Sequence, residues 1–342
     1  MINDNTYIPV MFNIHVEPEM RVIEYKKKRW LGYENLHAFL LEKRTDLEKS
    51  TGRPVNYNWL FRLDPQIQHV YGKPDWAMQQ YRTLINEAAT AGDEIGVHVH
   101  SWRPYQKWWR KSWVAEFSDG DWIRSCVDMA HHAFVDSMQL QPKSFSFGDQ
   151  YMSDDVLTQL EILGYRCDIS MHPKHQPKPL LAKGEKHTGN IPDYQETPRR
   201  PFKPSHKNFT KPISGDERSI WEIPPSVGKL ENQENTNISY HQKLLLGIPF
   251  DRIPKIVDQN LALPDPYLLA EMRTDVRMDA YNRTQFDQAV EYFMNHALSK
   301  NMSFSTLADF TDHLDTRLAK TLAGNNALKN EFNSIPQPNE TP

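Results

Sequence analysis

The chain has 342 residues, with 40 basic and 44 acidic side chains and a formal net charge of −4. This length suits one large α/β domain or two small ones, and the lack of a strongly basic half gives a nucleic-acid partner no electrostatic support. Two distant cysteines, Cys126 and Cys167, exclude a disulfide framework. The N-terminus lacks a signal-peptide pattern, and no apolar run approaches the length of a membrane span. We therefore expect a cytoplasmic protein without a membrane span.

Short apolar runs alternate with amphipathic helical stretches along the chain. We expect strands over residues 8–16, 55–63, 94–100, 143–147, 165–169, 220–223, 267–271 and 302–304. Helices are expected over residues 34–50, 75–91, 121–138, 153–163 and 282–299, and from 306 onward. Repeated β–α units in this number predict one α/β barrel spanning residues 1–320, followed by a frayed tail over 321–342.

A long segment rich in proline and lysine interrupts this alternation over residues 172–218. Long loops in compact domains are usually functional lids or disordered. We expect the segment to cover the barrel mouth and to influence substrate choice. Its histidines, among them His172 and His175, are not expected to bind a metal.

The most informative stretch is the apolar run that ends in His98 and His100. Side chains alternate faces along a strand, so both imidazoles point to one side while Val97 and Val99 can be buried on the other. Two imidazoles that converge at a strand end suit a divalent metal. The alternative is a pair of structural histidines.

Catalytic groups in barrels lie where the strands end. This rule selects polar residues that should meet at one end of the barrel: His15, Glu17, Arg62, Asp64, His98, His100, Asp149, Glu222, Arg273 and Asp275.

Four stretches together resemble the polysaccharide deacetylases, the NodB-homology superfamily, and in particular a divergent branch found in surface-polysaccharide gene clusters. They are residues 12–18 (FNIHVEP), 94–102 (EIGVHVHSW), 143–148 with 160–170, and 197–205 with 220–226. The resemblance implies a distorted (β/α) barrel of the glycoside hydrolase/deacetylase type, metal dependence, and a role in carbohydrate metabolism and polysaccharide biosynthesis.

The chain also departs from the family pattern. The family's first strand usually carries Asp where His15 stands, its histidines are spaced four apart whereas Trp102 occupies that position, and Ser146 stands in place of an arginine. The late-strand histidine that serves as an acid is not evident. The fold is expected to survive these changes, but the family's mechanism does not transfer intact.

A metal hydrolase needs about three protein ligands and one open position. His15, Glu17, His98 and His100 supply that number, and zinc is the expected ion. Asp64 is the first candidate for the general base and Glu17 the second. Arg62 or Arg273 could bind the oxyanion or a substrate carboxylate. The alternative for Arg62 and Asp64 is an ion pair that only fixes the strand end.

Two further residues are candidates for substrate binding. Trp102 could stack on the apolar face of a sugar, although an aromatic side chain can equally fill a core. Glu222 could contact substrate, or it could be a buried carboxylate that binds loop amides.

Three functions remain open. The first is hydrolysis of the C–N amide bond of an N-acylated sugar or polysaccharide intermediate by a metal-dependent enzyme. The second is a catalytically silent barrel that binds a glycan or a sugar nucleotide. The third is a metal-dependent hydrolase of a small non-sugar amide. Bound metal would separate the first and third from the second.

Overall fold

The computed structural model describes residues 7–333, apart from 21, 108–109, 180, 182–183, 232–238 and 276–279. Its main sheet is entirely parallel and has the strand order β12-β1-β2-β3-β6-β7-β9, with β13 beside the start of β1. The strands are β1 (Ile8–Val16), β2 (Asn58–Arg62), β3 (Glu94–Val99), β6 (Ser144–Phe147), β7 (Cys167–Asp168), β9 (Trp221–Glu222), β12 (Leu268–Arg273) and β13 (Met302–Phe304).

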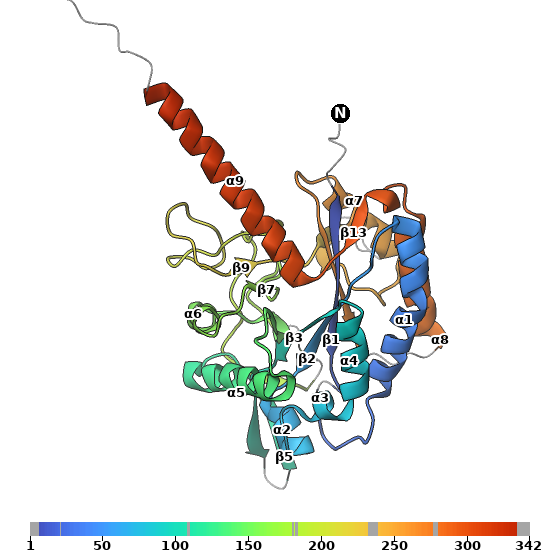
Figure 1. The fold of residues 1–342 in the computed structure, drawn as a ribbon. Helices are drawn as coiled ribbons and strands as arrows, with labels where there is room; N and C mark the ends of the chain where they lie inside the picture. Colours follow the sequence, from blue (N-terminus) through green and yellow to red (C-terminus); the bar gives the residue numbers. More distant parts are fainter. Residues whose placement is uncertain are drawn as a thin grey trace, which may run out of the picture.

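Helices surround this sheet, as Figure 1 shows. They are α1 (Leu31–Thr51), α2 (Pro65–Tyr71), α3 (Trp76–Gln80), α4 (Arg82–Thr90), α5 (Gly120–Met138), α6 (Asp154–Ile162), α7 (Ile253–Leu261), α8 (Ala280–Asn295) and α9 (Leu307–Asn333). The described helices include none that is long and apolar enough to cross a membrane.

Alternation along the strands divides the buried residues into two layers. On β1, Phe12 and Ile14 belong to the core beneath the helices, whereas Met11 points the other way, into a second cluster. That second cluster collects inward side chains from several strands and the first turns of α9: Met11, Leu60, Cys167, Ile169, Trp221, Ile223, Leu269, Leu307 and Phe310. The sheet therefore encloses its own core, as a barrel does. The first turns of α9 cover this core at the end of the barrel where the strands begin.

The barrel is closed irregularly between β9 and β12. No strand of the described chain pairs with both. Instead, the backbone N–H of Ser226 donates to the carbonyl of Leu269 (3.1 Å), and that of Leu246 donates to the carbonyl of Glu271 (2.8 Å). Separate backbone hydrogen bonds from the chain after β9 thus replace a continuous ladder between two strands. This confirms the prediction of a distorted (β/α) barrel.

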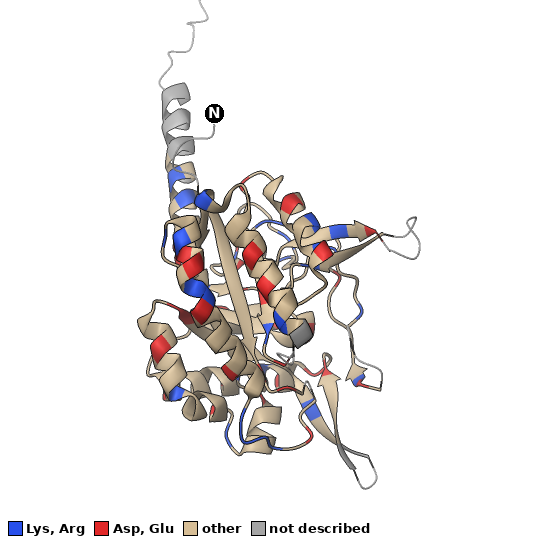
Figure 2. Ribbon diagram, turned by 90° about the vertical axis from the view of Figure 1, so that its right-hand side faces the viewer, with Lys and Arg blue, Asp and Glu red and all other residues tan. Residues whose placement is uncertain are grey.

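Two hairpins extend from the same side of the barrel. Strands β4 (Trp102–Lys107) and β5 (Arg110–Glu116) pair antiparallel. Strand β8 (Lys186–Thr188) pairs parallel with β5 and completes a sheet of three strands. The second hairpin is β10 (Val227–Glu231) with β11 (Ser239–Lys243). In Figure 2 they project at the lower and the upper right. Neither hairpin was predicted from the sequence.

Other differences are local. The helix expected over residues 75–91 is divided into α3 and α4, and the helix α2 begins directly after β2 with Asp64 as its N-cap. Helix α9 continues to Asn333, so the segment from residue 321 is helical up to that point, where a frayed tail was expected. Residues 334–342 lie outside the described part of the chain.

The barrel interior has no room for a side chain at Gly96 on β3. A Cβ atom there would lie 2.3 Å from Cδ2 of Leu60 and 2.5 Å from Oγ of Ser144. We predict that Gly96→Ala lowers the free energy of unfolding by about 1–3 kcal/mol, the usual effect of overpacking. Urea denaturation measures it. Gly120→Ala at the start of α5 is the matched control, because its nearest neighbour lies 3.5 Å away. Equal stability of the two variants would contradict the packing.

Candidate metal centre

The carboxyl ends of β1, β2, β3, β6 and β12 bring most of the predicted site residues together. Glu17 follows β1, His98 and His100 end β3, Asp149 follows β6, and Arg273 ends β12. All five residues line a cavity of about 400 Å³, together with His15, Ser146 and Gly148. A cavity of this volume is large enough for a small-molecule ligand.

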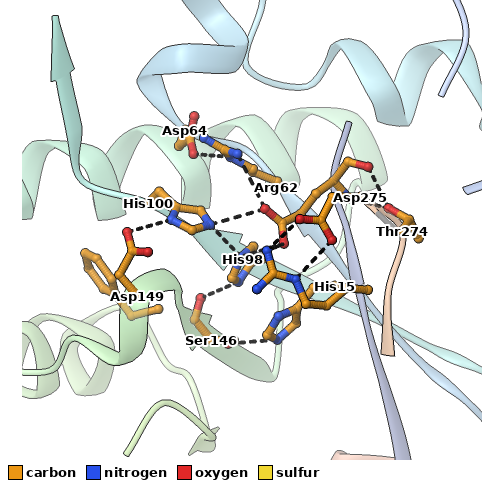
Figure 3. A network of polar contacts seen from close by, with 12 residues as sticks. His15, Arg62, Asp64, His98, His100, Ser146, Asp149, Thr274 and Asp275 are labelled. Atoms are coloured by element: carbon orange, nitrogen blue, oxygen red, sulfur yellow. Dashed lines mark hydrogen bonds and ion pairs between the residues drawn. The ribbon is translucent and has the colours of Figure 1, made fainter. Parts of the chain in front are cut away.

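The atoms Nε2 of His98 and Nε2 of His100 lie 3.1 Å apart, and both face the carboxylate of Glu17. Oε2 of Glu17 lies 3.3 Å from Nε2 of His100, and Oε1 lies 3.8 Å from Nε2 of His98. Figure 3 shows the two imidazoles converging. Oε1 is buried and accepts no hydrogen bond among the described residues.

The opposite nitrogen of each ring is held by the protein. Nδ1 of His98 lies 3.1 Å from the carbonyl oxygen of Ser146, and Nδ1 of His100 lies 3.0 Å from Oδ2 of Asp149. Both acceptors require a protonated Nδ1, which leaves the lone pair of each Nε2 directed at the other ring and at Glu17. Metal-ligating histidines are oriented in this way by acceptors behind the ring.

Two ring nitrogens and a carboxylate that face one another are stabilised by positive charge between them, either a proton on His100 or a metal ion. The pKa of His98 lies well below its usual range because the ring is buried and lies beside His15. Burial and Arg62 oppose protonation of His100, but the carboxylates of Asp149 and Glu17 outweigh them and raise its pKa. The residues therefore fit a divalent metal with a His₂Glu donor set.

A second donor combination shares two of these residues. Donor atoms of His15, Glu17 and His98 also lie within 4.8 Å of one another. The rings of His15 and His98 are stacked with their centres 4.2 Å apart, and Nε2 of His15 lies 3.1 Å from Oγ of Ser146. His15 thus already has a protein partner, whereas the Nε2 atoms of His98 and His100 face the same point. We favour the combination with His100.

Close packing fixes the position of His100. A Cβ atom at Gly148 would lie only 2.2–2.5 Å from three atoms of the His100 ring. The next two residues, Asp149 and Gln150, have φ values of 58° and 63°. Left-handed backbone is uncommon for residues other than glycine and persists where the surroundings enforce it. The turn after β6 is therefore shaped to bring the Asp149 carboxylate behind His100.

Arg62 is fully buried and connects the ends of β1 and β2. Its guanidinium lies 2.5 Å from Oδ2 of Asp64, 3.4 Å from Oε2 of Glu17 and 2.6 Å from Oε1 of Gln66. Arg273 approaches Glu17 from the other side (3.4 Å) and binds Asp275 (2.8 Å). Arg273, the hydrogen bond from His100 and the ring of His98 hold the pKa of Glu17 well below its usual range despite the opposing effect of burial. Glu17 is a carboxylate at neutral pH.

The structure gives Asp64 a different environment from the one expected of a base. Its Oδ1 accepts the backbone N–H groups of Gln66 (2.9 Å) and Ile67 (3.2 Å), and its Oδ2 binds Arg62. It does not line the cavity. These contacts favour the alternative considered above, in which Asp64 anchors Arg62 at the strand end. Arg62 likewise lies outside the cavity lining, whereas Arg273 lines it.

The two candidates for substrate binding also lie behind the site. The indole N–H of Trp102 donates to Oδ2 of Asp149 (2.9 Å), so this buried ring supports the turn after β6. Oε1 of Glu222 accepts the backbone N–H of Met171 (3.0 Å), and burial beside Asp168 raises the pKa of Glu222 well above its usual range. Neither residue lines the cavity. Both positions match the structural alternatives.

The opposite side of the cavity was not predicted as a site. It is formed by the chain after β7 and by strand β11: His172, Pro173, Lys174, His175, Tyr240, His241, Gln242 and Lys243. The long segment over 172–218 therefore contributes only its first residues to the cavity, and Phe202 farther along pairs with Glu222. The ammonium of Lys243 lies 2.5 Å from Oε2 of Glu271. No spacing rule links β11 to the strand ends.

Comparison with known proteins gives structural likenesses only. No family model matches the chain, and no curated protein matches it. Among solved structures, the chain is similar to a putative polysaccharide deacetylase from Mycobacterium smegmatis (10% identity, TM-score 0.48, 93% of both chains). It is also similar to Puue allantoinase (13%, 0.49, 91% of both chains). A third likeness is a CE4 family pseudoenzyme from Bacillus anthracis (7%, 0.39, 90% of this chain and 66% of the other).

We predict that Asp64→Asn lowers the free energy of unfolding by about 3–5 kcal/mol, because it leaves the buried charge of Arg62 without its nearest partner. Chemical denaturation measures this change. Asp119→Asn is the matched control, since Asp119 also caps a helix through its side chain but its ion pair with Arg103 is partly exposed. A fully stable Asp64→Asn protein that has lost hydrolysis would restore Asp64 as the base.

The similar solved structures include the polysaccharide deacetylases that the sequence resembles.

Proposed function

We propose that the chain is a metal-dependent hydrolase that cleaves the C–N amide bond of an N-acylated sugar. One observation carries the proposal: the lone pairs of His98 and His100 and the carboxylate of Glu17 converge on one point at the floor of a cavity. His₂Glu sets with an open position are typical of catalytic zinc. The sugar is proposed from the motifs shared with polysaccharide deacetylases.

The bound ion would polarise the scissile carbonyl and activate a water molecule. The residues of the chain do the rest. Arg273 and the two rings keep Glu17 ionised, and Ser146 and Asp149 accept from Nδ1 of the two histidines, so that Nε2 is the nitrogen that each ring would offer to the ion. Arg273 lines the cavity and is the side chain placed to donate to a developing oxyanion. Its charge is secured by Glu17 and Asp275, which raise its pKa despite burial.

His15 is the residue placed to transfer the proton. It lines the cavity, lies against His98, and has Nδ1 3.7 Å from Oε1 of Glu271. Burial lowers its pKa well below the usual range, so the ring is neutral at neutral pH. Glu17, the second candidate for the base, is then a ligand.

We predict that His100→Ala and Glu17→Gln each abolish stoichiometric metal binding, because each removes one of three ligands. Elemental analysis of purified protein, with zinc supplied, measures this. His132→Ala is the control, since His132 is an exposed histidine on α5. His15→Gln should keep the metal and lose amide hydrolysis by about a hundredfold or more. If His15→Gln loses the metal and His100→Ala keeps it, the site is the set of His15, Glu17 and His98.

We predict that Asp149→Asn lowers metal affinity about 10–100-fold without emptying the site at saturating zinc. Asp149 reaches the candidate metal centre through the ring of His100, and an amide in its place accepts a weaker hydrogen bond. Competition with a chromogenic chelator measures the affinity. Asp155→Asn on the exposed surface of α6 is the control. An unchanged affinity would remove Asp149 from the support of the metal centre.

Wild-type protein that binds no metal and hydrolyses neither acylated sugars nor small amides would overturn the proposal in favour of a silent binding barrel. Metal binding with hydrolysis of small amides alone would assign the third function considered above.

A further inference from the structure

We propose that the substrate of this cavity carries an anionic substituent, a carboxylate or a phosphate, that binds opposite the metal centre. The inference rests on the proposed function and specifies its substrate class. The residues concerned are Lys174, His175 and His241, here called the basic wall, which line the cavity from the chain after β7 and from strand β11.

Within the part of the chain that the structure describes, the basic wall carries one positive charge that is not neutralised, the ammonium of Lys174, beside two histidines whose pKa burial lowers. Nζ of Lys174 donates to the carbonyl oxygen of Gln195 (2.7 Å), a neutral acceptor. Among the residues that the structure describes, neither Lys174 nor His241 forms an ion pair with a carboxylate. Burial, and then the charges of Lys174, Arg199 and Lys229, lower the pKa of His241. Arg199 and Lys229 are thus two further cations near this ring. The lowered pKa leaves His241 neutral at pH 7, and an anion held between this ring and the ammonium of Lys174 would be stabilised by the surrounding positive charge.

Arg199 adds positive charge near the basic wall, and its hydrogen-bond partners among the described residues are neutral. Its guanidinium donates to the carbonyl of Val227 (2.6 Å) and to Oδ1 of Asn260 (3.3 Å), both neutral groups. Burial lowers the pKa of Arg199. A half-buried guanidinium without a carboxylate among the described residues is unusual, because charge is normally paired when it is removed from water.

The acidic side chains of the cavity cannot serve as counter-ions for the basic wall. Glu17 faces Arg62, Arg273 and the two histidines, and Asp149 binds His100. Glu271 binds Lys243, the one lysine of β11 that is neutralised within the cavity. The cavity is therefore polarised: its carboxylates are paired around the candidate metal centre and Lys243, and the ammonium of Lys174 on the chain after β7 is left without one among the residues described.

The backbone of Lys174 adopts an unfavourable conformation at the cavity. Its φ is +68°, in the left-handed region that favours glycine, and its N–H donates to the carbonyl oxygen of Tyr194 (2.9 Å). Such strain persists where the surroundings enforce it, and it is concentrated at functional sites. A lysine held in this conformation at a cavity rim is an independent indication that its charge is used.

The test compares the binding of neutral and anionic sugars by calorimetry, in chelator-treated and in zinc-supplied full-length protein. The probes are N-acetylglucosamine, its 6-phosphate, and the uronate made by oxidising C6. We expect at least one anionic probe to bind about tenfold more tightly than the neutral sugar. Lys174→Gln should remove most of this preference, and Lys174→Gln/His241→Gln all of it. The control Lys178→Gln changes an exposed lysine of the same segment outside the cavity and should leave the preference intact.

The probe that loses affinity in Lys174→Gln identifies the anion as phosphate or carboxylate. Equal affinity for neutral and anionic sugars in the wild type, or an equal loss in Lys174→Gln and Lys178→Gln, would overturn the inference. Because binding is measured without hydrolysis, the two proposals fail separately. An anion preference in a protein that binds no metal would keep this inference and overturn the enzymatic one, whereas hydrolysis of neutral sugars alone would do the reverse.

Discussion

The buried charge of Arg62 is the constraint on which the rest of the site depends. A guanidinium with no exposure to solvent is tolerated only when its charge and its donors are satisfied. Glu17 after β1, Asp64 after β2 and Gln66 on α2 meet that requirement together. The chain must therefore bring the ends of two strands and the start of a helix into one arrangement, which places Glu17 beside Arg62 and close to the two histidines.

The rest of the site geometry follows from the charge of Glu17. The ionised Glu17 attracts positive charge to its free side, where Arg273 and the rings of His98 and His100 lie. The orientation of those rings is set by Ser146 and Asp149, one through a backbone carbonyl and one through a turn in an uncommon conformation. The glycine before that turn leaves space for the imidazole. Each step is a requirement of charge or of volume, and each uses a different strand of the barrel.

The sequence was sufficient for the parts of the structure that depend on local periodicity. The strand over residues 8–16 agrees with β1, and the same-face placement of His98 and His100 followed from alternation alone. The strand-end rule placed Glu17, Asp149 and Arg273 correctly around one cavity. It also selected Asp64 and Glu222, because it cannot tell a carboxylate that faces the cavity from one that caps a helix or binds a loop amide.

What the sequence could not supply depends on contacts between distant segments. Lys243 and His241 reach the cavity through the β10–β11 hairpin, which carries no chemical motif, and Lys174 reaches it through a backbone conformation that a lysine rarely adopts. Gly96 and Gly148 matter only because of the rings and side chains that pack against them from other strands. The contacts of Asp64 could not be foreseen for the same reason: its partner amides belong to a helix that the apolar pattern did not reveal.

The candidate metal centre and the basic wall are built on different parts of this irregularly closed barrel. The metal centre is built on regular strands whose ladders are continuous, so its atoms are held by many hydrogen bonds at once. Of the basic wall, His241 lies on the hairpin at this irregular closure, whereas Lys174 and His175 lie on the chain after β7. Changes of length or charge in the hairpin alter what enters the cavity while the ladders beneath the ligands stay in register. A barrel closed in this way can acquire a new substrate without rebuilding its chemistry.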